Sequence, residues 1–452
     1  MGFQPRFHDK PKVTFLGAAG TVTGSMHLLE WRNFRFLFDC GMEKDRKPGP
    51  REAEFPFDPA LIDAVFLSHD HSDHCGKLPL LEHLGFRGQI YCTAPSKDFL
   101  SLVLRDTVRI QQQEARTRHA SSPANQHDAF TLLDRCVTLD YGKTHEVRHD
   151  VKLRFHDACH LLGSAVTELE LGSEGESFRI VYSGDLGRRS LPFLPVPQPL
   201  PPADLLICES TYGGKIHDSP ATMAAKLHEV LSDTIRRGGK ALIPAFSLGR
   251  TQLLLHYLDT WMEEGKIPDL PIYLDSPLAV EIGRVHHRHR GRLAVNWNTF
   301  PDRLTVLESW DEAQAASFSP DPCILVASGG MCEGGRIISH LKNHLDDPRT
   351  SIILVSFQAP GTLGAKLLEK KPSVFFQGRS WNKWAEVHEI KGFSGHADHD
   401  DFLALLGPTK NSTRAIRLVH GEPESARALA KGLTEHGFHN VKPVKKGESF
   451  TL

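Results

Sequence analysis

The chain has 452 residues, with 53 basic and 55 acidic side chains and a formal net charge of −2. The length suits two or three domains, and a hydrophobic fraction of 40% is ordinary for a globular protein. The near-zero charge excludes a global basic field, so a polyanionic partner would have to be bound by local patches.

Short β-rich runs come first, and we expect strands within 12–20, 25–31 and 34–41, the last ending in FDCG. The apolar strand AVFLS, residues 64–68, leads directly into HDHSDH at 69–74. A strand that ends in potential ligands holds the start of the ligand loop in a fixed position. The next expected elements are a helix at 77–86, a strand at 89–95, a helix at 96–119 and a polar loop at 121–129.

The sequence RIVYSGDLG at 179–187 repeats this design, because an apolar strand again ends in an aspartate, Asp185. The segment 191–202 carries six prolines and is interpreted as a stiff connection, before another buried strand at 204–210. Beyond it, continuous apolar runs alternate with helical segments. This alternation predicts a parallel sheet with helices on its faces.

Two strand-to-helix junctions, 244–255 and 326–341, contain glycine turns. Helix N-termini behind such turns suit anionic groups, although neither junction has the GK[ST] ending of a P-loop. Ordinary strand-to-helix turns remain the alternative. The candidate anion contacts are Ser247, Arg250, Ser328, Gly329 and Gly330.

The segment HDHSDH holds four potential metal ligands, His69, His71, Asp73 and His74. Imidazole and carboxylate groups suit a divalent ion near neutral pH. In an extended or tightly turned segment, the first two histidines can point one way and the last two residues another, so one loop can serve two metals. A bridging acid and more histidines are then needed, and the strand-end residues Asp185, His160 and His420 qualify. The alternative is a solvated surface loop.

These residues carry a family resemblance. FDCG with Asp39, then HDHSDH, His160 and Asp185, resemble the metallo-β-lactamase fold in order and spacing. The strings ESTYG (209–213), GFSGHAD (392–398) and VHGE (419–422) resemble the β-CASP branch of that superfamily. This branch contains nucleases of RNA and DNA, including the endonuclease of mRNA 3′-end processing, ribonuclease J and the Artemis group.

The resemblance implies an α/β protein, a metallo-β-lactamase αββα sandwich with an inserted parallel-sheet β-CASP domain. The sandwich would comprise residues 1–209 and 391–452, and the insert residues 210–390. The chain ends about 30 residues after His420, without the further C-terminal domain of ribonuclease J. It is therefore expected to be a minimal, bacterial-type RNA-processing member.

The resemblance also implies roles for residues. One zinc ion would bind His69, His71 and His160, a second would bind Asp73, His74 and His420, and Asp185 would bridge them. Asp39 would orient ligand histidines, although it could simply form a strand-end turn. Glu209 would hydrogen-bond His396, which would protonate the leaving oxygen or, alternatively, only bind phosphate.

The implied reaction is hydrolysis of phosphodiester bonds by a hydroxide held between two Zn²⁺ ions, leaving 5′-phosphate and 3′-hydroxyl ends. In this family the last motif carries histidine in the RNA branches and usually valine in the DNA branch. His420 therefore favours single-stranded RNA as the substrate. The basic stretch GRVHHRHRGR at 283–292 is either a solvated helix face or a track for that RNA.

Other readings use parts of the same pattern. A glyoxalase II-like thioesterase would share HDHSDH but explains neither the inserted domain nor Glu209 with His396. An oxygen-reducing di-iron protein usually has glutamate where His71 stands. An RNA-binding scaffold related to inactive members would have lost ligands, and every ligand position is present here.

The expected compartment is the cytoplasm. The eight cysteines are scattered without a CxxC pair, which is typical of a reducing environment. The polar N-terminus lacks the apolar core of a signal peptide, and no run approaches the roughly 18 apolar residues of a membrane span. No membrane partner is expected, and a homodimer is an open possibility for the oligomeric state.

Overall fold

The computed structural model describes residues 9–43, 55–117, 126–172, 177–191, 193–297 and 303–452. The chain divides into two compact units. The first comprises 1–189, 194–216 and 396–452, and the second comprises 190–193 and 217–395. No helix among the described residues combines the length and the apolar character that crossing a bilayer requires.

The first unit is built on two seven-stranded sheets. One sheet has the order β22 (Ser449–Thr451), β1 (Lys12–Phe15), β2 (His27–Trp31), β3 (Phe34–Phe38), β4 (Ala64–Phe66), β5 (Gln89–Cys92) and β6 (Cys136–Thr138). The other has the order β21 (Val441–Pro443), β20 (Ile416–Val419), β11 (Leu205–Glu209), β10 (Phe178–Tyr182), β9 (Ala165–Leu171), β8 (Val151–Asp157) and β7 (Thr144–Arg148).

The two sheets pack face to face over an apolar core. Alternating residues of the strands supply it, including Phe15 and Phe36 from one sheet and Leu169 and Ile207 from the other, all fully buried. This alternation is the period-two pattern of half-buried strands. Continuous burial of β11 and β20 shows that the second sheet is covered on its other face as well.

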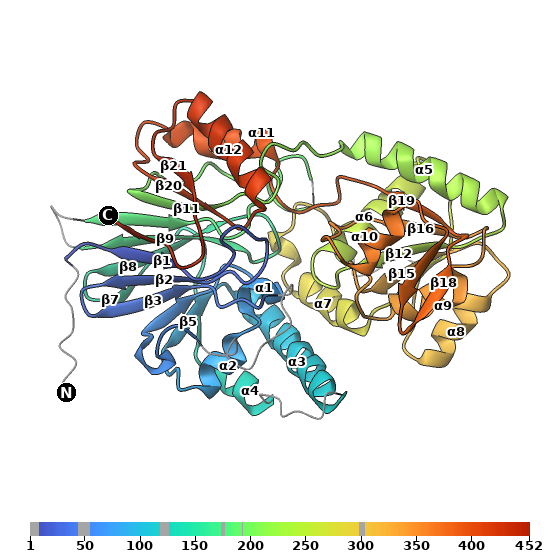
Figure 1. The fold of residues 1–452 in the computed structure, drawn as a ribbon, viewed down its shortest axis with the longest axis horizontal. Coiled ribbons are helices and arrows are strands. Elements are labelled where there is room, and N and C mark those ends of the chain that lie inside the picture. The colour runs from blue at the N-terminus through green and yellow to red at the C-terminus, as the bar shows by residue number, and fades with distance from the viewer. Residues whose placement is uncertain (1–8, 44–54, 118–125, 173–176, 192, 298–302) are drawn as a thin grey trace. The chain divides into compact units, whose positions relative to one another are not determined.

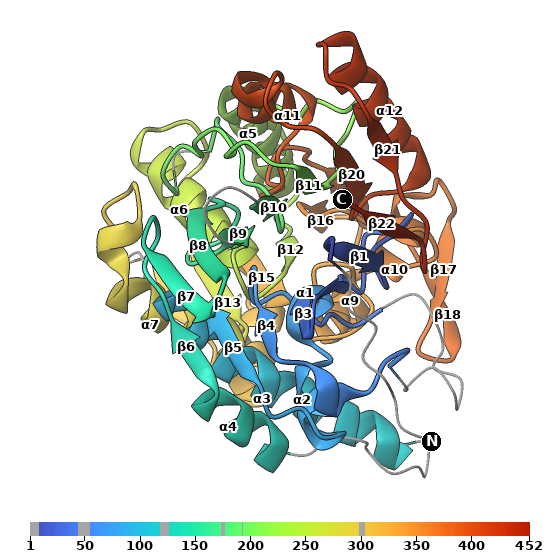
Figure 2. The same ribbon diagram turned by 90° about the vertical axis from the view of Figure 1, so that its left-hand side faces the viewer.

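Helices cover the outer faces of this sandwich (Figure 1). On the second sheet lie α11 (His399–Leu406) and α12 (Pro423–Glu435), whose residues Phe402 and Leu429 pack on Leu206 and Leu418. Figure 2 shows the helices beneath β5 and β6. They are α2 (Leu78–His83), α3 (Ala94–Thr117) and α4 (Gln126–Asp134), and the single-turn helix α1 (Ser72–Cys75) precedes them. The expected αββα sandwich is confirmed.

The second unit contains the expected parallel sheet, with the order β14 (Leu304–Val306), β13 (Ile272–Asp275), β15 (Ile324–Ser328), β12 (Ala241–Ala245), β16 (Ser351–Leu354) and β19 (Glu386–Glu389). A hairpin of β17 (Ser373–Phe376) and β18 (Arg379–Asn382) accompanies it. Its helices are α5 (Pro220–Arg236), α6 (Arg250–Glu263), α7 (Pro277–Arg288), α8 (Trp310–Phe318), α9 (Ile337–His344) and α10 (Leu363–Leu368).

The strand order explains which helices share a face. The chain runs from β12 through β13 to the edge strand β14, then turns back through β15 to β16. Right-handed crossovers therefore place α6 and α7 on one face and α8 and α9 on the other. Two helices start with the same local signal, because Ser219 and Ser276 cap α5 and α7 just before a proline.

One expectation about a local element is wrong. Residues 126–129, expected in a polar loop, form the start of α4, where Ala129 packs inward at 1% exposure. Burial of that apolar face outweighs the weak helix propensity of the segment. The rest of the expected loop, 121–125, and residues 118–119 at the end of the expected helix lie outside the described residues.

Candidate metal centre

The ligand loop leaves the end of β4 and coils at once into α1. His69 follows the strand, and His71 is the residue that caps the helix, in extended backbone with φ −65° and ψ 143°. Asp73 and His74 therefore lie on the helical turn, where the sequence suggested only a change of direction. This change in backbone geometry lets four of six consecutive residues face two neighbouring clusters.

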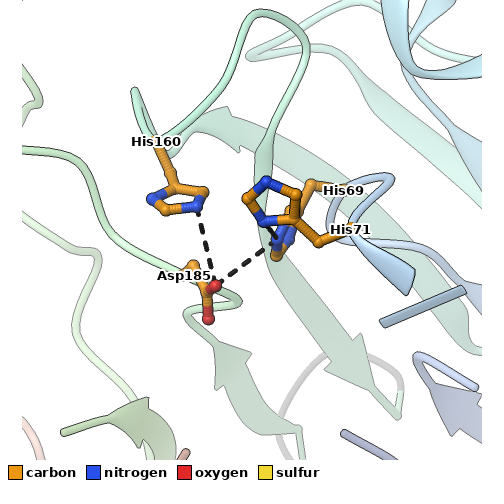
Figure 3. A group of neighbouring side chains, drawn as sticks. All are labelled: His69, His71, His160 and Asp185. Atoms are coloured by element: carbon orange, nitrogen blue, oxygen red, sulfur yellow. Dashed lines mark hydrogen bonds and ion pairs between the residues drawn. The ribbon is translucent and has the colours of Figure 1, made fainter. Parts of the chain in front are cut away.

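The first cluster contains His69, His71, His160 and Asp185, whose ligand atoms all lie within 4.8 Å of one another. Figure 3 shows the imidazoles of His69 and His160 both directed at the Asp185 carboxylate. The distances from Asp185 Oδ2 are 3.4 Å to His69 Nε2 and 3.7 Å to His160 Nε2. His69 Nε2 and His71 Nδ1 are 3.1 Å apart.

The second cluster contains Asp73, His74 and His420, again within 4.8 Å. The Nε2 atoms of His74 and His420 are 3.2 Å apart, and Asp73 Oδ2 is 3.5 Å from His420 Nε2. The other oxygen of Asp185, Oδ1, lies 3.4 Å from His74 Nε2. The Asp185 carboxylate therefore faces one cluster with each oxygen.

Strand direction explains why these distant residues meet. β10 is parallel to β11, and β11 is parallel to β20, so their carboxyl ends lie at one edge of the second sheet. Asp185 follows β10, Glu209 ends β11 and His420 follows β20. Two antiparallel steps bring β8 into the same direction, which carries His160 to the same edge.

The donor atoms fit bound metal ions. Both ring nitrogens of His160, and Asp185 Oδ1, are buried without a hydrogen-bond partner among the described residues. Buried polar atoms are almost always satisfied, so such a group of orphans needs a ligand. Ring nitrogens of His69 and His71 lie 3.1 Å apart, and those of His74 and His420 lie 3.2 Å apart, so each pair is directed into a shared space. Divalent cations at the two clusters would satisfy Asp185 Oδ1 and the His160 nitrogen that faces Asp185, Nε2.

Electrostatics favour the metal-binding protonation state at His69, His71, His160 and Asp185, and the protonated form at His74. Burial lowers the pKa of His69, His71 and His160, so these imidazoles are neutral at pH 7. Burial would raise the pKa of Asp185, but the surrounding histidines, His420 and His74 first, hold it well below its usual range. Burial also opposes charge on His74, yet Asp185 and Asp39 raise its pKa well above the ordinary value. The pocket around His74 thus attracts positive charge.

Asp39 holds His74 in one orientation. Its Oδ2 accepts a hydrogen bond from His74 Nδ1 at 2.6 Å and others from Ser68 Oγ and Tyr182 Oη, each at 2.7 Å. Its Oδ1 accepts from the Ser68 amide at 2.7 Å. Because His74 Nδ1 donates its proton here, Nε2 is the ring nitrogen that faces the second cluster.

Glu209 and His396 form a second oriented pair. Glu209 Oε1 lies 3.1 Å from His396 Nδ1 and also accepts from the Leu186 amide at 2.7 Å. Its Oε2 accepts from the Thr211 amide at 3.2 Å. Glu209 is fully buried, whereas the side chain of His396 is 17% exposed. The pair therefore presents a partly accessible imidazole beside Asp185, with His396 Nδ1 at 3.8 Å from Asp185 Oδ2.

The five candidate anion contacts lie in the second unit, whereas every residue of the two clusters belongs to the first. Register places Ser328 opposite Ala245, so both junctions meet at the carboxyl edge of β12 and β15. Ser247 Oγ pairs with Ser276 Oγ at 2.9 Å, and Gly330 accepts from Gln358 at 2.9 Å. Arg250 begins α6 and Gly329 has a φ of 112°.

Sequence reasoning missed two members of the Asp39 network, Ser68 and Tyr182. The parallel pairing of β3 with β4 places Phe38 beside Phe66, so an aspartate just after the first strand meets a residue just after the second. That pairing could have indicated Ser68. No local signal indicates Tyr182, which enters from the opposite sheet.

Comparison with known families gives three matches along the chain. A β-lactamase superfamily domain matches residues 34–234, a β-CASP domain matches 251–367, and a Zn-dependent metallo-hydrolase RNA specificity domain matches 384–443. Together with the buried donor clusters, these matches define a metal-dependent hydrolase. The chain belongs to the β-CASP family of metallo-β-lactamase nucleases.

Individual relatives agree with this assignment. Ribonuclease TTHA0252 of Thermus thermophilus is 36% identical over 446 residues, covering 97% of this chain and 99% of the relative. The transcription termination factor FttA of Pyrococcus horikoshii is 33% identical over 449 residues, covering 93% of this chain and 68% of the relative. A crystal structure of a protein of unknown function from Enterococcus faecalis shares the fold, with a TM-score of 0.57, 15% identity and coverage of 98% of this chain and all of that one.

Proposed function

We propose that this chain hydrolyses phosphodiester bonds of single-stranded RNA at two zinc ions and leaves 5′-phosphate and 3′-hydroxyl ends. The observation that carries the proposal is the Asp185 carboxylate, which faces a histidine cluster with each of its oxygens. RNA is supported by His420, by the match to an RNA specificity domain and by the similarity to a ribonuclease that spans almost the whole chain.

In this proposal His69, His71 and His160 would hold the first ion, and Asp73, His74 and His420 would hold the second, with Asp185 as a ligand that both could share. When bound, two such ions lower the pKa of a water molecule and neutralise charge on the phosphate. The other residues prepare the site for that chemistry.

The first of these preparations concerns His74. Asp39 binds Nδ1 and so directs Nε2 toward the second cluster, where Nε2 would release its proton on binding an ion, because Asp185 and Asp39 raise the pKa of His74. The second concerns the leaving oxygen, which needs a proton as the phosphodiester breaks. Glu209 fixes His396 through Nδ1 and leaves Nε2 to deliver that proton. If His396 only binds phosphate, its removal would weaken substrate binding and spare the rate of cleavage at saturation.

Contacts to the rest of the strand are proposed in the second unit. Ser247, Arg250, Ser328, Gly329 and Gly330 lie at the carboxyl edge of its parallel sheet, where ligands bind in open α/β sheets. The basic patch ends α7, and its Arg288 and Arg290 are exposed, while His286 is buried. The exposed arginines support a phosphate track.

The domain assignment also remains a proposal, with a sandwich of 1–209 and 391–452 and an insert of 210–390. We propose the cytoplasm as the compartment, because all eight cysteines are unpaired in the structure.

Metal content and cleavage test the function together. Zinc would be measured by mass spectrometry in the wild-type protein and in His160→Ala and His420→Ala, one variant for each cluster. The matched control is His149→Ala, whose side chain is 90% exposed. The same proteins would receive 5′-labelled single-stranded RNA.

We expect two zinc ions per wild-type and control chain, less metal in each cluster variant, and RNA cleavage only where both ions are present. Full cleavage by chelated wild-type protein would contradict the proposal. A metal-loaded protein that binds RNA without cutting it would indicate a scaffold, and thioester hydrolysis in place of RNA cleavage would indicate the thioesterase.

A further inference from the structure

The second unit carries a hollow of about 610 Å³ between α8 and α9. Figure 1 shows these two helices beside each other. Its lining includes Trp310 and Gln314 from α8, and Arg336, Ile338, Lys342 and Asn343 from the α9 segment. The described residues that line it contain two cationic side chains and no carboxylate.

The walls of this hollow are held rigidly. Gln314 Nε2 donates to Ser339 Oγ at 3.4 Å, and Asn343 Nδ2 donates to Gln314 Oε1 at 3.3 Å. A capping box, in which Ser309 and Glu312 bond each other's backbone amides, fixes the first turn of α8. Trp310 is the first residue of that turn, so the capping box orders its backbone, and its side chain is 59% exposed.

One end of the hollow, at Arg336, lies at the carboxyl edge of the parallel sheet. The Arg336 amide donates to Ser328 Oγ at the end of β15, and its guanidinium pairs with Asp275 at the end of β13 at 2.8 Å. This edge is where open α/β sheets bind their ligands. The charge of Arg336 is partly neutralised by its ion pair with Asp275, whereas Lys342 has no ion-pair partner among the described residues.

The side chains present complementary chemistry to one nucleotide. An exposed indole on a rigid turn provides a stacking face for a base, and such stacking tolerates any base. The second N–H of Gln314 and the carboxamide oxygen of Asn343 remain available to a base edge, and Lys342 can neutralise a phosphate. A hydrophobic protein partner is less suited, because Trp310 and Ile338 are the only large apolar side chains among the described lining residues.

We propose that this hollow binds one nucleotide of a single RNA strand, with its base stacked on Trp310 and its phosphate against Lys342. The inference rests on the proposed ribonuclease function and adds a subsite to it. The subsite increases affinity for strands long enough to occupy it, and it takes no part in bond cleavage. Trp310 is therefore a specificity and affinity residue of the second unit.

The test compares zinc-loaded wild type, Trp310→Ala, Trp310→Phe and Lys342→Gln. The matched control is Trp384→Ala, because Trp384 is 60% exposed and belongs to the same unit. Steady-state cleavage would be measured on single-stranded RNAs of increasing length and on bis(p-nitrophenyl) phosphate, a phosphodiester without bases. RNA carrying 5-bromouridine would be crosslinked to wild type and the attachment site mapped by mass spectrometry.

We expect Trp310→Ala to raise KM for long RNA about 10-fold with kcat unchanged, since loss of one stacked base is worth roughly 5- to 100-fold in binding. Trp310→Phe should retain most of the affinity. Lys342→Gln should reduce the slope of log KM against log salt by about 0.7, the value for one phosphate contact on a single strand. Hydrolysis of the small phosphodiester should be equal in all variants, and the crosslink should map to Trp310.

Equal KM values for Trp310→Ala and Trp384→Ala on long RNA, with no crosslink at Trp310, would overturn the subsite and leave the ribonuclease function intact. A wild-type protein that hydrolyses bis(p-nitrophenyl) phosphate but neither cuts nor binds RNA would overturn the proposed function and this inference with it.

Discussion

Replacing Asp39 by asparagine changes one atom of the carboxylate and should disable His74 as a metal ligand. Oδ2 of Asp39 accepts from His74 Nδ1 at 2.6 Å, from Ser68 Oγ at 2.7 Å and from Tyr182 Oη at 2.7 Å. Oδ1 must remain an oxygen, because it accepts from the Ser68 amide at 2.7 Å. The new amide nitrogen therefore faces His74.

The consequence is a change of tautomer. The hydroxyls of Ser68 and Tyr182 can rotate and accept from the new amide, but His74 Nδ1 must give up its proton to do so. The proton then sits on Nε2, which lies 3.2 Å from His420 Nε2 and faces the metal cluster. Loss of an orienting partner of a metal ligand typically costs 10- to 100-fold in metal affinity, or about 1.4 to 2.8 kcal/mol.

The assay is competition for zinc against a chromogenic chelator. We expect the zinc site that contains His74 to lose about 10- to 100-fold in affinity in Asp39→Asn. The zinc site of the first cluster should be nearly unchanged. Tyr182→Phe is the matched control, because it removes one donor but keeps the carboxylate on His74, and its effect should be smaller. Equal zinc affinities for Asp39→Asn and wild type would refute the proposed role of Asp39.

Further predictions concern proton donation by His396, binding of the RNA strand and the stability of the second unit. His396→Ala should lower kcat for RNA by roughly 10²- to 10⁴-fold while zinc content stays at the wild-type value, as measured by single-turnover cleavage and mass spectrometry; an unchanged rate at neutral pH would exclude the acid role. Combined replacement of Arg288, Arg290 and Arg292 by alanine should flatten the salt dependence of RNA binding measured by anisotropy, and an unaltered slope would leave these arginines as a solvated helix face. Burial lowers the pKa of His286 from 6.5 to about 4, so the unfolded chain binds an extra proton between these pH values. The free energy of unfolding of the second unit should therefore fall by up to about 3 kcal/mol as the pH drops from 6.5 to 4. In denaturant titrations, His286→Gln should lessen this fall. A variant with the same pH dependence as wild type would contradict the prediction.

The strands and the ligand-bearing loops were predictable from sequence. The strand-forming run 64–68 is followed directly by His69, and the run 179–182 is followed closely by Asp185. Burial of a strand leaves a clear hydrophobic pattern in the sequence, which marks where each potential ligand begins. The parallel sheet of the second unit followed from the same signal. In each case the information is local, because it depends on residues that are neighbours in the chain.

Features that depend on tertiary pairing were not predictable. Tyr182 reaches Asp39 across 143 positions of sequence and between two sheets, and nothing in the sequence near Tyr182 marks that contact. The hollow beside Trp310 likewise exists only because α8 and α9 return to the same face of the sheet. The helical start at 126–129 was missed because burial, and not propensity, forms it.

Metal-dependent cleavage of RNA is the central claim, and one measurement tests it most directly. Zinc-loaded protein would be incubated with 5′-labelled single-stranded RNA and with DNA of matched sequence, with and without a chelator, and the products resolved by length and tested for a 5′-phosphate on the downstream fragment. The account predicts that RNA is cut, that DNA survives, that the chelator stops the reaction and that zinc restores it. A protein that holds two zinc ions and cuts neither strand would contradict it.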